Sequence, residues 1–522
     1  MLARVTTFAI DGLESRRVTV EIDVRAGLPN FTIVGLGDRA VREARERVRA
    51  AVLNSGFVFP LKRVTVNLAP AYLHKTGPGF DLAIACAVLG ASGQIPTDAL
   101  ESRAVFGELS LSGELRPCRG ALAVAQGALE AGLSGLVVPP QRVAEAALVG
   151  GLDVVGAATL ADVARVLRGE ETTQPATLAE SAAPGAAARA AIDLGDVRGH
   201  AGVIGALTVA AAGGHNLLLS GPPGVGKTML ARRLPTILPP LGRDEALEVT
   251  RIHSVAGLYR GGGLLAERPF RAPHHTISPS GLVGGGAVPI PGEASLAHHG
   301  VLFLDELSEF PRSTLEALRQ PLEDGRAAIV RGQRTAIFPT RFMLVAATNP
   351  CPCGHAPTRR CRCTESDLAR HRRRLSGPLL DRIDLLVPVL RPTAAELASG
   401  PVTSSQVERE RVLEARERQT RRLAGTPARC NAHMDSRLLR THLALDDVAE
   451  RPLRRAYERG ALSARGRDRA LRVARTVADL AGSERIAVGH VTAALGYRHD
   501  AESVDDAAAW TPRSERAEGR AS

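Results

Sequence analysis

Lysine, aromatic residues and long apolar runs are all scarce in this chain. Only Lys62, Lys75 and Lys227 are lysines, so nearly all of the 66 basic residues are arginines. Aromatic residues make up 3% of the sequence, which leaves alanine, valine, leucine and isoleucine to build the cores. No stretch of about 18 apolar residues is present, so no membrane-spanning helix is expected. The N-terminal residues also lack the apolar run of a signal peptide, and we expect a cytoplasmic protein without a membrane partner.

The charge balance of the chain is strongly basic. The formal net charge is +11 and the isoelectric point is near 9.9, which favours a polyanionic partner such as nucleic acid. Because the basic residues are so biased towards arginine, their number does not locate a binding surface, and solvated basic faces are the alternative. The apolar content of 44% and the charged content of 23% are ordinary for a globular protein.

Sequence patterns divide the chain into five segments. Residues 1–168 alternate strand-like and helical runs, and residues 169–191 are rich in Ala, Thr, Pro and Ser, which is typical of a linker. Residues 192–395 alternate apolar strands with helices, the pattern of a parallel α/β sheet. Residues 396–498 carry helical patterns, and residues 499–522 are predicted to be a disordered tail.

Five elements are predicted within the first segment. Short runs at 18–24, 31–36 and 63–69 look like strands. Residues 39–52 and 80–89 have helical periodicity. The N-terminal segment is therefore expected to be an α/β domain.

The most specific motif begins at Gly221. The sequence GPPGVGKT has the spacing GxxxxGK[ST], with an apolar strand predicted before it and an amphipathic helix after it. Glycines let backbone N–H groups converge on phosphate oxygens, and the helix N-terminus favours negative charge. Lys227 would contact the β- and γ-phosphates of ATP, and the Thr228 hydroxyl would bind magnesium. The predicted ATP-binding residues are Gly221, Pro222, Pro223, Gly224, Val225, Gly226, Lys227 and Thr228.

Polar residues also follow two later strands of the predicted sheet. Asp305 and Glu306 follow the apolar strand at 301–304, and open α/β sheets bind ligands at the carboxyl ends of their strands. Asp305 is therefore a candidate magnesium ligand and Glu306 a candidate general base for the attacking water, with a helix cap as the alternative. Asn349 follows the strand at 342–347, where its amide would orient the water or contact the γ-phosphate. Asn before Pro is also an ordinary turn signal.

The order of these motifs resembles the Walker A, Walker B and sensor 1 elements of AAA+ ATPases. Three further segments are similar to the magnesium-chelatase-like branch, specifically the ComM/YifB family: RPFRAPHHTIS at 268–278, LLDRIDL at 379–385 and LSARGRDRALRVARTVADL at 462–480. The resemblance covers residues 1–498. It implies an AAA+ core with a helical lid, the cofactors ATP and Mg²⁺, and a homo-hexameric ring.

The resemblance also gives roles to two arginines. Arg382 matches the arginine finger, which stabilises transition-state charge on the γ-phosphate of a neighbouring subunit. Arg465 matches sensor 2 on the helical lid. By residue type alone, both would be expected in surface ion pairs. The predicted catalytic set is Glu306, Lys227, Arg382, Asn349 and Arg465.

Four of the seven cysteines are close together in CPCGHAPTRRCRC. Four thiolates can close a tetrahedral structural zinc site without an open position for catalysis, and Gly and Pro permit the tight loop. An iron–sulfur cluster and free thiols are the alternatives. The pairs His274-His275 and His298-His299 are expected to make loop contacts, because adjacent histidines do not share a helix face. The candidate zinc ligands are Cys351, Cys353, Cys361 and Cys363.

Two insertions between the phosphate loop and Asn349 carry basic residues. The first, at about 254–292, is rich in glycine, and the second, at 327–338, is predicted to be a β-hairpin with a basic tip. In related ring ATPases such insertions line the central pore and grip the DNA backbone, which would make binding sensitive to salt. Ordinary exposed hairpins are the alternative. The candidate DNA-binding residues are Arg260, Arg271, Arg331 and Arg334.

The segment HKTGPGFD at 74–81 resembles the part of Lon-type domains that carries the proteolytic serine. Gly79 stands at the corresponding position and has no hydroxyl, so serine nucleophilic chemistry is not available there. The resemblance implies a Lon-like N-terminal scaffold without protease activity. A plain Gly/Pro turn before a helix is the alternative.

Together these features favour an ATP-driven DNA motor. The resemblance implies a hexameric branch-migration helicase that acts on recombination intermediates during DNA uptake. One alternative is a chelatase-type subunit that uses ATP to assist magnesium insertion into a porphyrin. Another is a scaffold that binds ATP only to assemble, which an active Glu306→Gln variant would support.

Overall fold

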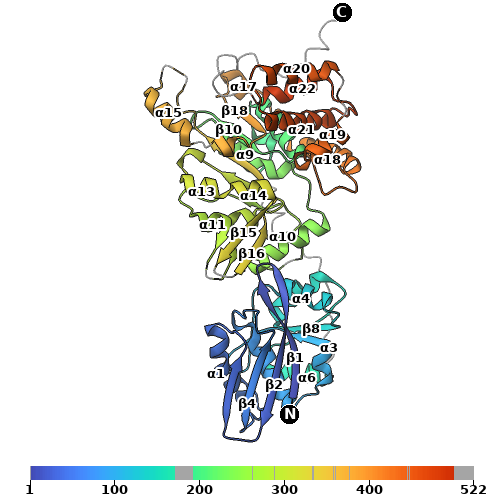
Figure 1. The fold of residues 1–522 in the computed structure, drawn as a ribbon. Coiled ribbons are helices and arrows are strands. Elements are labelled where there is room, and N and C mark those ends of the chain that lie inside the picture. The colour runs from blue at the N-terminus through green and yellow to red at the C-terminus, as the bar shows by residue number, and fades with distance from the viewer. Residues whose placement is uncertain are drawn as a thin grey trace, which may run out of the picture.

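The chain folds into three parts arranged along one long axis (Figure 1). The N-terminal part, coloured blue to cyan, lies at one end, and the C-terminal helices, coloured red, lie at the other. Residues 171–191 of the predicted linker and the predicted tail at 499–522 lie outside the described residues. The computed structural model describes residues 2–170, 192–261, 263–286, 288–331, 334–356, 358, 360–374, 377–443, 445 and 447–498.

The N-terminal part is built on a seven-stranded mixed sheet with strand order β3-β4-β2-β1-β5-β8-β9. β1 and β2 pair antiparallel, whereas β5, β8 and β9 run parallel to one another. The strands are β1 (Leu2–Asp11), β2 (Glu14–Arg25), β3 (Asn30–Val34), β4 (Arg63–Ala69), β5 (Arg103–Val105), β8 (Gly135–Val138) and β9 (Asp153–Gly156). The small ribbon is β6 (Glu108–Leu109) with β7 (Leu115–Arg116). The helices are α1 (Arg39–Asn54), α2 (Asp81–Ala91), α3 (Asp98–Ser102), α4 (Ala121–Glu130), α5 (Pro140–Ala146) and α6 (Leu160–Leu167).

All five elements predicted in this part are confirmed. In β2, Val18, Val20 and Ile22 are fully buried while the residues between them reach the other face, as expected for a strand covered on one side. Every residue of α2 is buried, because this helix packs between α1 and the strands β1 and β2. A helix that is apolar on all sides after its first residue belongs in the centre of a domain.

The middle part contains a five-stranded parallel sheet with strand order β11-β14-β17-β10-β18. The strands are β10 (Leu217–Ser220), β11 (Phe270–Arg271), β14 (Val301–Leu304), β17 (Met343–Thr348) and β18 (Leu385–Pro388). The helices are α8 (Ala201–Gly213), α9 (Lys227–Ile237), α10 (Arg243–Val255), α11 (Pro279–Val283), α12 (Glu293–Leu296), α13 (Arg312–Ala317), α14 (Arg319–Asp324), α15 (Glu365–Arg374), α16 (Gly377–Leu380) and α17 (Ala394–Ala398). The parallel α/β core expected from the sequence is confirmed.

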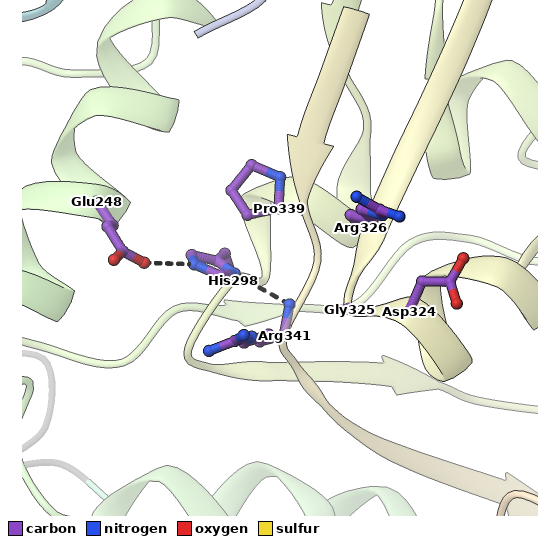
Figure 2. Close-up of a pocket in the computed structure, with 7 residues that line it drawn as sticks. All are labelled: Glu248, His298, Asp324, Gly325, Arg326, Pro339 and Arg341. Atoms are coloured by element: carbon purple, nitrogen blue, oxygen red, sulfur yellow. Dashed lines mark hydrogen bonds and ion pairs between the residues drawn. The ribbon is translucent and has the colours of Figure 1, made fainter. Parts of the chain in front are cut away.

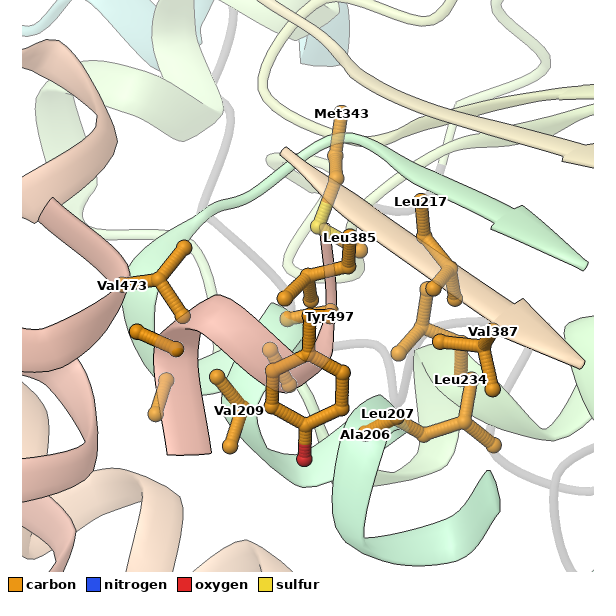
Figure 3. Packing of buried hydrophobic residues seen from close by; sticks show 14 of the residues in the cluster. Ala206, Leu207, Val209, Leu217, Leu234, Met343, Leu385, Val387, Val473 and Tyr497 are labelled. Atoms are coloured by element: carbon orange, nitrogen blue, oxygen red, sulfur yellow. The ribbon is translucent and has the colours of Figure 1, made fainter. Parts of the chain in front are cut away.

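Both faces of this sheet are covered, which explains why its strands are continuously apolar. Leu217 and Leu219 face α8, α9 and the C-terminal helices, whereas Leu218 between them belongs to the cluster on the opposite face. Figure 3 shows Leu217, Leu385 and Tyr497 in the first of these clusters, so the C-terminal helices share a core with the sheet. The sheet is therefore fixed from both sides, and its carboxyl edge is a rigid platform.

The predicted hairpin is confirmed as β15 (Arg326–Arg331) and β16 (Arg334–Pro339), and a smaller ribbon pairs β12 (Gly284–Gly285) with β13 (Ile290–Pro291). Phe270 and Arg271, which the sequence placed in the glycine-rich insertion, form strand β11 at the edge of the core sheet. Ile329 and Phe338 of the hairpin pack in one cluster with Leu13 from the β1–β2 turn. One face of the hairpin is therefore anchored on the N-terminal part.

The C-terminal part is a bundle of five helices: α18 (Ser405–Arg422), α19 (Ser436–His442), α20 (Asp447–Glu458), α21 (Ala464–Leu480) and α22 (Val488–Gly496). Its buried Asp479 binds Arg422 and Arg475, and Asn431 also donates to it at 2.8 Å. The backbone N–H of Leu386 in β18 donates to the carbonyl of Tyr497, so the bundle is joined to the sheet. None of the helices in the described ranges combines the length and the apolar character that crossing a bilayer requires.

Candidate nucleotide-binding site and cysteine cluster

The segment between β10 and α9 forms a tight loop at the N-terminus of the helix. Gly224 and Gly226 have φ angles of +78° and +92°, which residues with a side chain rarely adopt. A Cβ at Gly221 would lie 2.2 Å from the carbonyl oxygen of Val389, so only glycine fits against this backbone. A glycine-rich loop that leads into a helix N-terminus is an arrangement that suits the phosphates of ATP.

Lys227 is held by three oxygen atoms around the loop. Its Nζ donates to the carbonyls of Gly221 and Pro222, at 2.6 and 2.8 Å, and to Oδ1 of Asn349 at 3.0 Å. Burial lowers the pKa of Lys227, whereas the carboxylates of Asp305 and Glu306 raise it. The ammonium group therefore joins the phosphate loop to the end of β17, although 122 positions separate Lys227 from Asn349 in the sequence.

The two predicted magnesium ligands lie in direct contact. The Thr228 hydroxyl on α9 donates to Oδ2 of Asp305 at 2.7 Å. Asp305 follows β14, and the other carboxylate oxygen accepts the backbone N–H of Glu306 at 3.0 Å. A hydroxyl and a carboxylate are oxygen ligands of the kind that Mg²⁺ prefers, so the donor set fits this ion.

Glu306 extends from the site into solvent. Its φ angle is +52°, a left-handed conformation that is uncommon for residues other than glycine and typical of functional sites. The side chain is 59% exposed, and its Oε2 lies 3.9 Å from Nδ1 of His275. A carboxylate in this position is accessible to water beside the magnesium ligands, as a general base must be. The neighbouring histidine is a contact that sequence reasoning did not identify.

Asn349 is held through both its side chain and its backbone carbonyl. Its Oδ1 accepts from Lys227, and its backbone carbonyl lies 2.9 Å from Nε2 of His371. His371 is buried on α15, beyond the cysteine cluster in the sequence. Only its contact with the carbonyl of Asn349 reveals this histidine, because an isolated His in a basic helix carries no sequence signal.

The two arginines assigned by resemblance lie within electrostatic range of each other. Arg382 follows α16, is largely buried, and forms an ion pair with Glu323 of α14. Burial lowers the pKa of Arg382, and Arg319 and Arg465 lower it further. Arg465 is exposed in the first turn of α21. The core and the C-terminal bundle therefore meet at Arg382, while the finger and sensor 2 roles stay predictions.

The described candidate DNA-binding arginines lie on different elements and differ in exposure. Arg331 is exposed at the end of β15, and Arg260 is exposed after α10. Arg271 is half-buried in β11, where its Nε and Nη2 donate to the carboxylate of Glu293 at 2.6 and 2.7 Å. The side chain of Arg334 lies outside the described residues. DNA contact by these residues stays a prediction, and Arg271 already has an acidic partner.

The four predicted zinc ligands converge, and their sulfur atoms all lie within 4.8 Å of one another. The Sγ of Cys351 is 3.4 Å from that of Cys353 and 3.8 Å from that of Cys361, and the last two are 3.6 Å apart. These separations are too long for disulfides, whose sulfurs are about 2.05 Å apart. The backbone N–H of Ala356 also points at the Sγ of Cys351, at 3.3 Å. Cys363 completes the cluster.

A second cluster joins Glu248 of α10 to His298 and His299, as expected for loop contacts. Their Nε2 atoms lie 2.9 and 2.8 Å from Oε2 of Glu248. Nδ1 of His298 accepts the backbone N–H of Arg341, so in the neutral ring the proton is on Nε2 and points at Glu248. Burial lowers the pKa of His298 to about 4, so the ring is neutral and donates to Glu248. Figure 2 shows this contact in a pocket lined by Glu248, His298, Asp324, Gly325, Arg326, Pro339 and Arg341.

The N-terminal part has no room for a serine at position 79. Gly79 is buried in a single 3-10 turn, Pro78–Phe80, and a Cβ there would lie 2.6 Å from the ring of Phe106. The next residue that could react, Asp81, is fully buried and paired with Arg47 at 2.7 Å. This packing supports the expectation that the turn has a structural role.

The fold and the assembled motifs define a class of protein. A five-stranded parallel sheet with a phosphate loop after β10, an acidic pair after β14, an Asn after β17 and a C-terminal helical bundle is the architecture of an AAA+ ATPase. The family model of magnesium chelatase, subunit ChlI, matches residues 193–397. Models of subunit ChlI of Mg-chelatase and of the subunit ChlI C-terminal part match residues 20–142 and 402–498.

Full-length relatives identify the branch. A Mycobacterium tuberculosis protein is 46% identical over 499 residues, which cover 95% of this chain and 98% of the relative. The competence protein ComM of Haemophilus influenzae is 43% identical and YifB of Escherichia coli is 42% identical, each over 501 residues that cover 95% of this chain and 97% of the relative. An archaeal Lon protease from Thermoplasma acidophilum is 32% identical over 132 residues, 23% of this chain and 20% of that protein. The chain belongs to the YifB/ComM family of magnesium-chelatase-type AAA+ ATPases.

Proposed function

We propose that this protein is an ATP-driven DNA motor that works as a hexameric ring and promotes branch migration of recombination intermediates. The observation that carries the proposal is the convergence of Lys227, Thr228, Asp305 and Asn349 at the carboxyl edge of one sheet. The full-length similarity to the competence protein ComM favours a role with DNA, because competence is the capacity to take up DNA. The net charge of +11 agrees with a polyanionic partner.

In this proposal ATP, when bound with Mg²⁺, supplies the phosphoryl group that is transferred to water. Lys227 would balance the charge of the phosphates, and Thr228 and Asp305 would hold the magnesium ion. Asn349, at the end of β17, would orient the attacking water or contact the γ-phosphate. Glu306, exposed beside them, accepts a proton from the attacking water. Arg382 and Arg465 act on the nucleotide at the boundary between subunits and between core and lid.

The hairpin β15–β16 is the DNA-contacting element that we propose. One face of it packs on the N-terminal part through Ile329 and Phe338, whereas Arg331 near its tip is exposed. Anchoring one face of a hairpin leaves its basic tip free to contact phosphates, and Arg334 and Arg260 would add to that surface. The N-terminal residues 1–168 would serve as a Lon-like scaffold for ring assembly.

Unwinding assays on forked and four-way DNA junctions test the proposal. The wild-type protein with ATP should separate the strands or move the junction, and the Lys227→Ala variant should not. DNA should also raise the rate of ATP hydrolysis. Equal junction activity in the two proteins, or a rate of ATP hydrolysis that DNA does not change, would exclude the proposed motor function.

A chelatase-type role is the second candidate, and the matches to magnesium chelatase subunit ChlI favour it. Such a subunit would hydrolyse ATP at the same site, but its rate would respond to a porphyrin-binding partner and not to DNA. The two candidates therefore separate on DNA stimulation of ATP hydrolysis. An ATPase that DNA leaves unchanged would favour the chelatase-type role.

A further inference from the structure

The cysteine cluster lies against the phosphate loop. A Cβ at Gly354, between Cys353 and Cys361, would lie 2.5 Å from Cδ of Pro223, so the cysteine loop packs closely on the proline of the phosphate loop. Gly354 has a φ angle of +78° and its N–H donates to the carbonyl of Cys351 at 2.9 Å, which makes a tight turn. Only a glycine can pack this closely, because any other residue would place a Cβ against Pro223.

In the sequence, the cluster also lies between Asn349 and α15, whose His371 contacts Asn349. Cys351 is fully buried two positions after Asn349, and α15, which carries His371, begins two positions after Cys363. A capping box between Thr364 and Asp367 sets the start of that helix. The Nε2 of His371 then lies 2.9 Å from the carbonyl of Asn349. The cysteine loop therefore connects Asn349 to the helix whose histidine contacts its carbonyl.

The sulfur geometry fits a single tetrahedral ion. With Zn–S bonds of about 2.3 Å, the sulfurs of a tetrahedral site are about 3.8 Å apart. The separations among Cys351, Cys353 and Cys361 are 3.4, 3.8 and 3.6 Å. A cluster of several iron atoms would place cysteine sulfurs on different irons, farther apart than the 4.8 Å limit that all four sulfurs meet.

We propose that Cys351, Cys353, Cys361 and Cys363 bind one zinc ion and that this ion holds the phosphate loop and Asn349 in the geometry that binds ATP. Zn²⁺ replaces the four thiol protons, which are released to solvent, and leaves a centre with a net charge of −2. The exposed Arg360 and Arg362 flank the ligands and offset this charge. Loss of the ion frees the loop that packs on Pro223, and nucleotide affinity falls with it.

The inference rests on the proposed nucleotide site but not on DNA, so it is tested without DNA. Zinc is measured by mass spectrometry in the purified wild-type chain and in a Cys361→Ser/Cys363→Ser variant, with Cys118→Ser as the matched control because Cys118 is outside the cluster. Binding of a fluorescent ATP analogue is then measured for each protein. The wild type and Cys118→Ser should hold one zinc per chain, and the double variant none, with nucleotide affinity weakened roughly tenfold or more.

Metal removal gives the same test without a substitution. Wild-type protein treated with a chelator should lose affinity for the ATP analogue and regain it when zinc alone is added, while circular dichroism shows that the fold persists. Chains that hold no zinc and bind none when it is added, or that hold iron and sulfide instead, would overturn the metal assignment. Unchanged nucleotide affinity after zinc loss would overturn the coupling.

The Lys227→Ala variant separates this inference from the proposed function. It should retain one zinc per chain, because its cysteine cluster is intact. It should fail to bind the ATP analogue, because the phosphate loop has lost its ammonium group. Zinc-loaded wild-type protein that does not bind the analogue would refute the proposed ATPase itself. An analogue that binds equally with and without zinc refutes only the coupling.

Discussion

Gly221→Ala is the substitution that most directly tests the proposed nucleotide site. The new Cβ would lie 2.2 Å from the carbonyl oxygen of Val389 and 3.1 Å from its carbonyl carbon. Non-bonded carbon and oxygen atoms do not approach closer than about 3 Å, so one of the two backbones must move by about 1 Å. Val389 is fully buried in the core shared with the C-terminal helices, so we expect the phosphate loop to be the part that shifts.

A displacement of about 1 Å in a group that positions a reacting atom lowers the rate by roughly a hundredfold. Gly221→Ala is therefore expected to lower kcat for ATP hydrolysis by about two orders of magnitude, measured by phosphate release at saturating ATP. Nucleotide affinity should fall as well, because the carbonyl of Gly221 is one of the acceptors that hold Lys227.

Gly242→Ala is the control, because its backbone φ is −67° and no heavy atom lies within 4 Å of the added Cβ. It should hydrolyse ATP within about twofold of the wild-type rate, since its Cβ points into open space. Circular dichroism and thermal melting should show that both variants fold. Hydrolysis by Gly221→Ala at the wild-type rate would show that the loop conformation described here is not the one that binds phosphate.

Three further predictions concern other parts of the chain. Gly205→Ala should stabilise the protein by about 0.5–1 kcal/mol in chemical denaturation, because Gly205 is exposed inside α8 with open space around its Cβ; a destabilised variant would contradict this. Arg331→Ala should weaken binding to a DNA fork and lower the slope of affinity against salt concentration by about the amount of one phosphate contact. Arg271→Ala should have a smaller effect, because Glu293 already pairs with Arg271, and equal losses in the two variants would refute this ranking. Burial lowers the pKa of His298 from 6.5 to about 4, so its contribution of about 3 kcal/mol to the free energy of unfolding is complete above pH 6.5 and lost as the pH falls towards 4. Compared by urea unfolding over that range, His298→Gln should show a shallower pH dependence than the wild type, and identical curves would exclude this role.

Local patterns in the sequence were enough to predict most elements of secondary structure. The strands at 18–24 and 63–69 have a period of two because one face of the sheet is buried, and the structure contains them as β2 and β4. The hairpin at 327–338 follows from the same alternation on either side of a short turn. Such patterns depend only on neighbours along the chain, so they can be recognised without the fold.

Strand β11 was not predicted, because it depends on a neighbouring strand and not on a local pattern. It contains only Phe270 and Arg271, which is too short to show a period, and it exists because β14 offers an unpaired parallel edge. The pairing of Glu248 with His298 and His299 was missed likewise, since 50 and 51 positions separate these residues. An acidic residue in an amphipathic helix gives no local sign of its partner.

The sequence by itself determined the phosphate loop, the acidic pair and the cysteine cluster, because glycine conformation, carboxylate chemistry and thiolate chemistry are properties of residue types and short spacings. Only the tertiary structure decided that Thr228 meets Asp305 across 77 positions, that Asn349 reaches Lys227, and that the cysteine loop packs on Pro223. Those contacts depend on strand order and on the packing of helices against the sheet, which many distant apolar residues fix together.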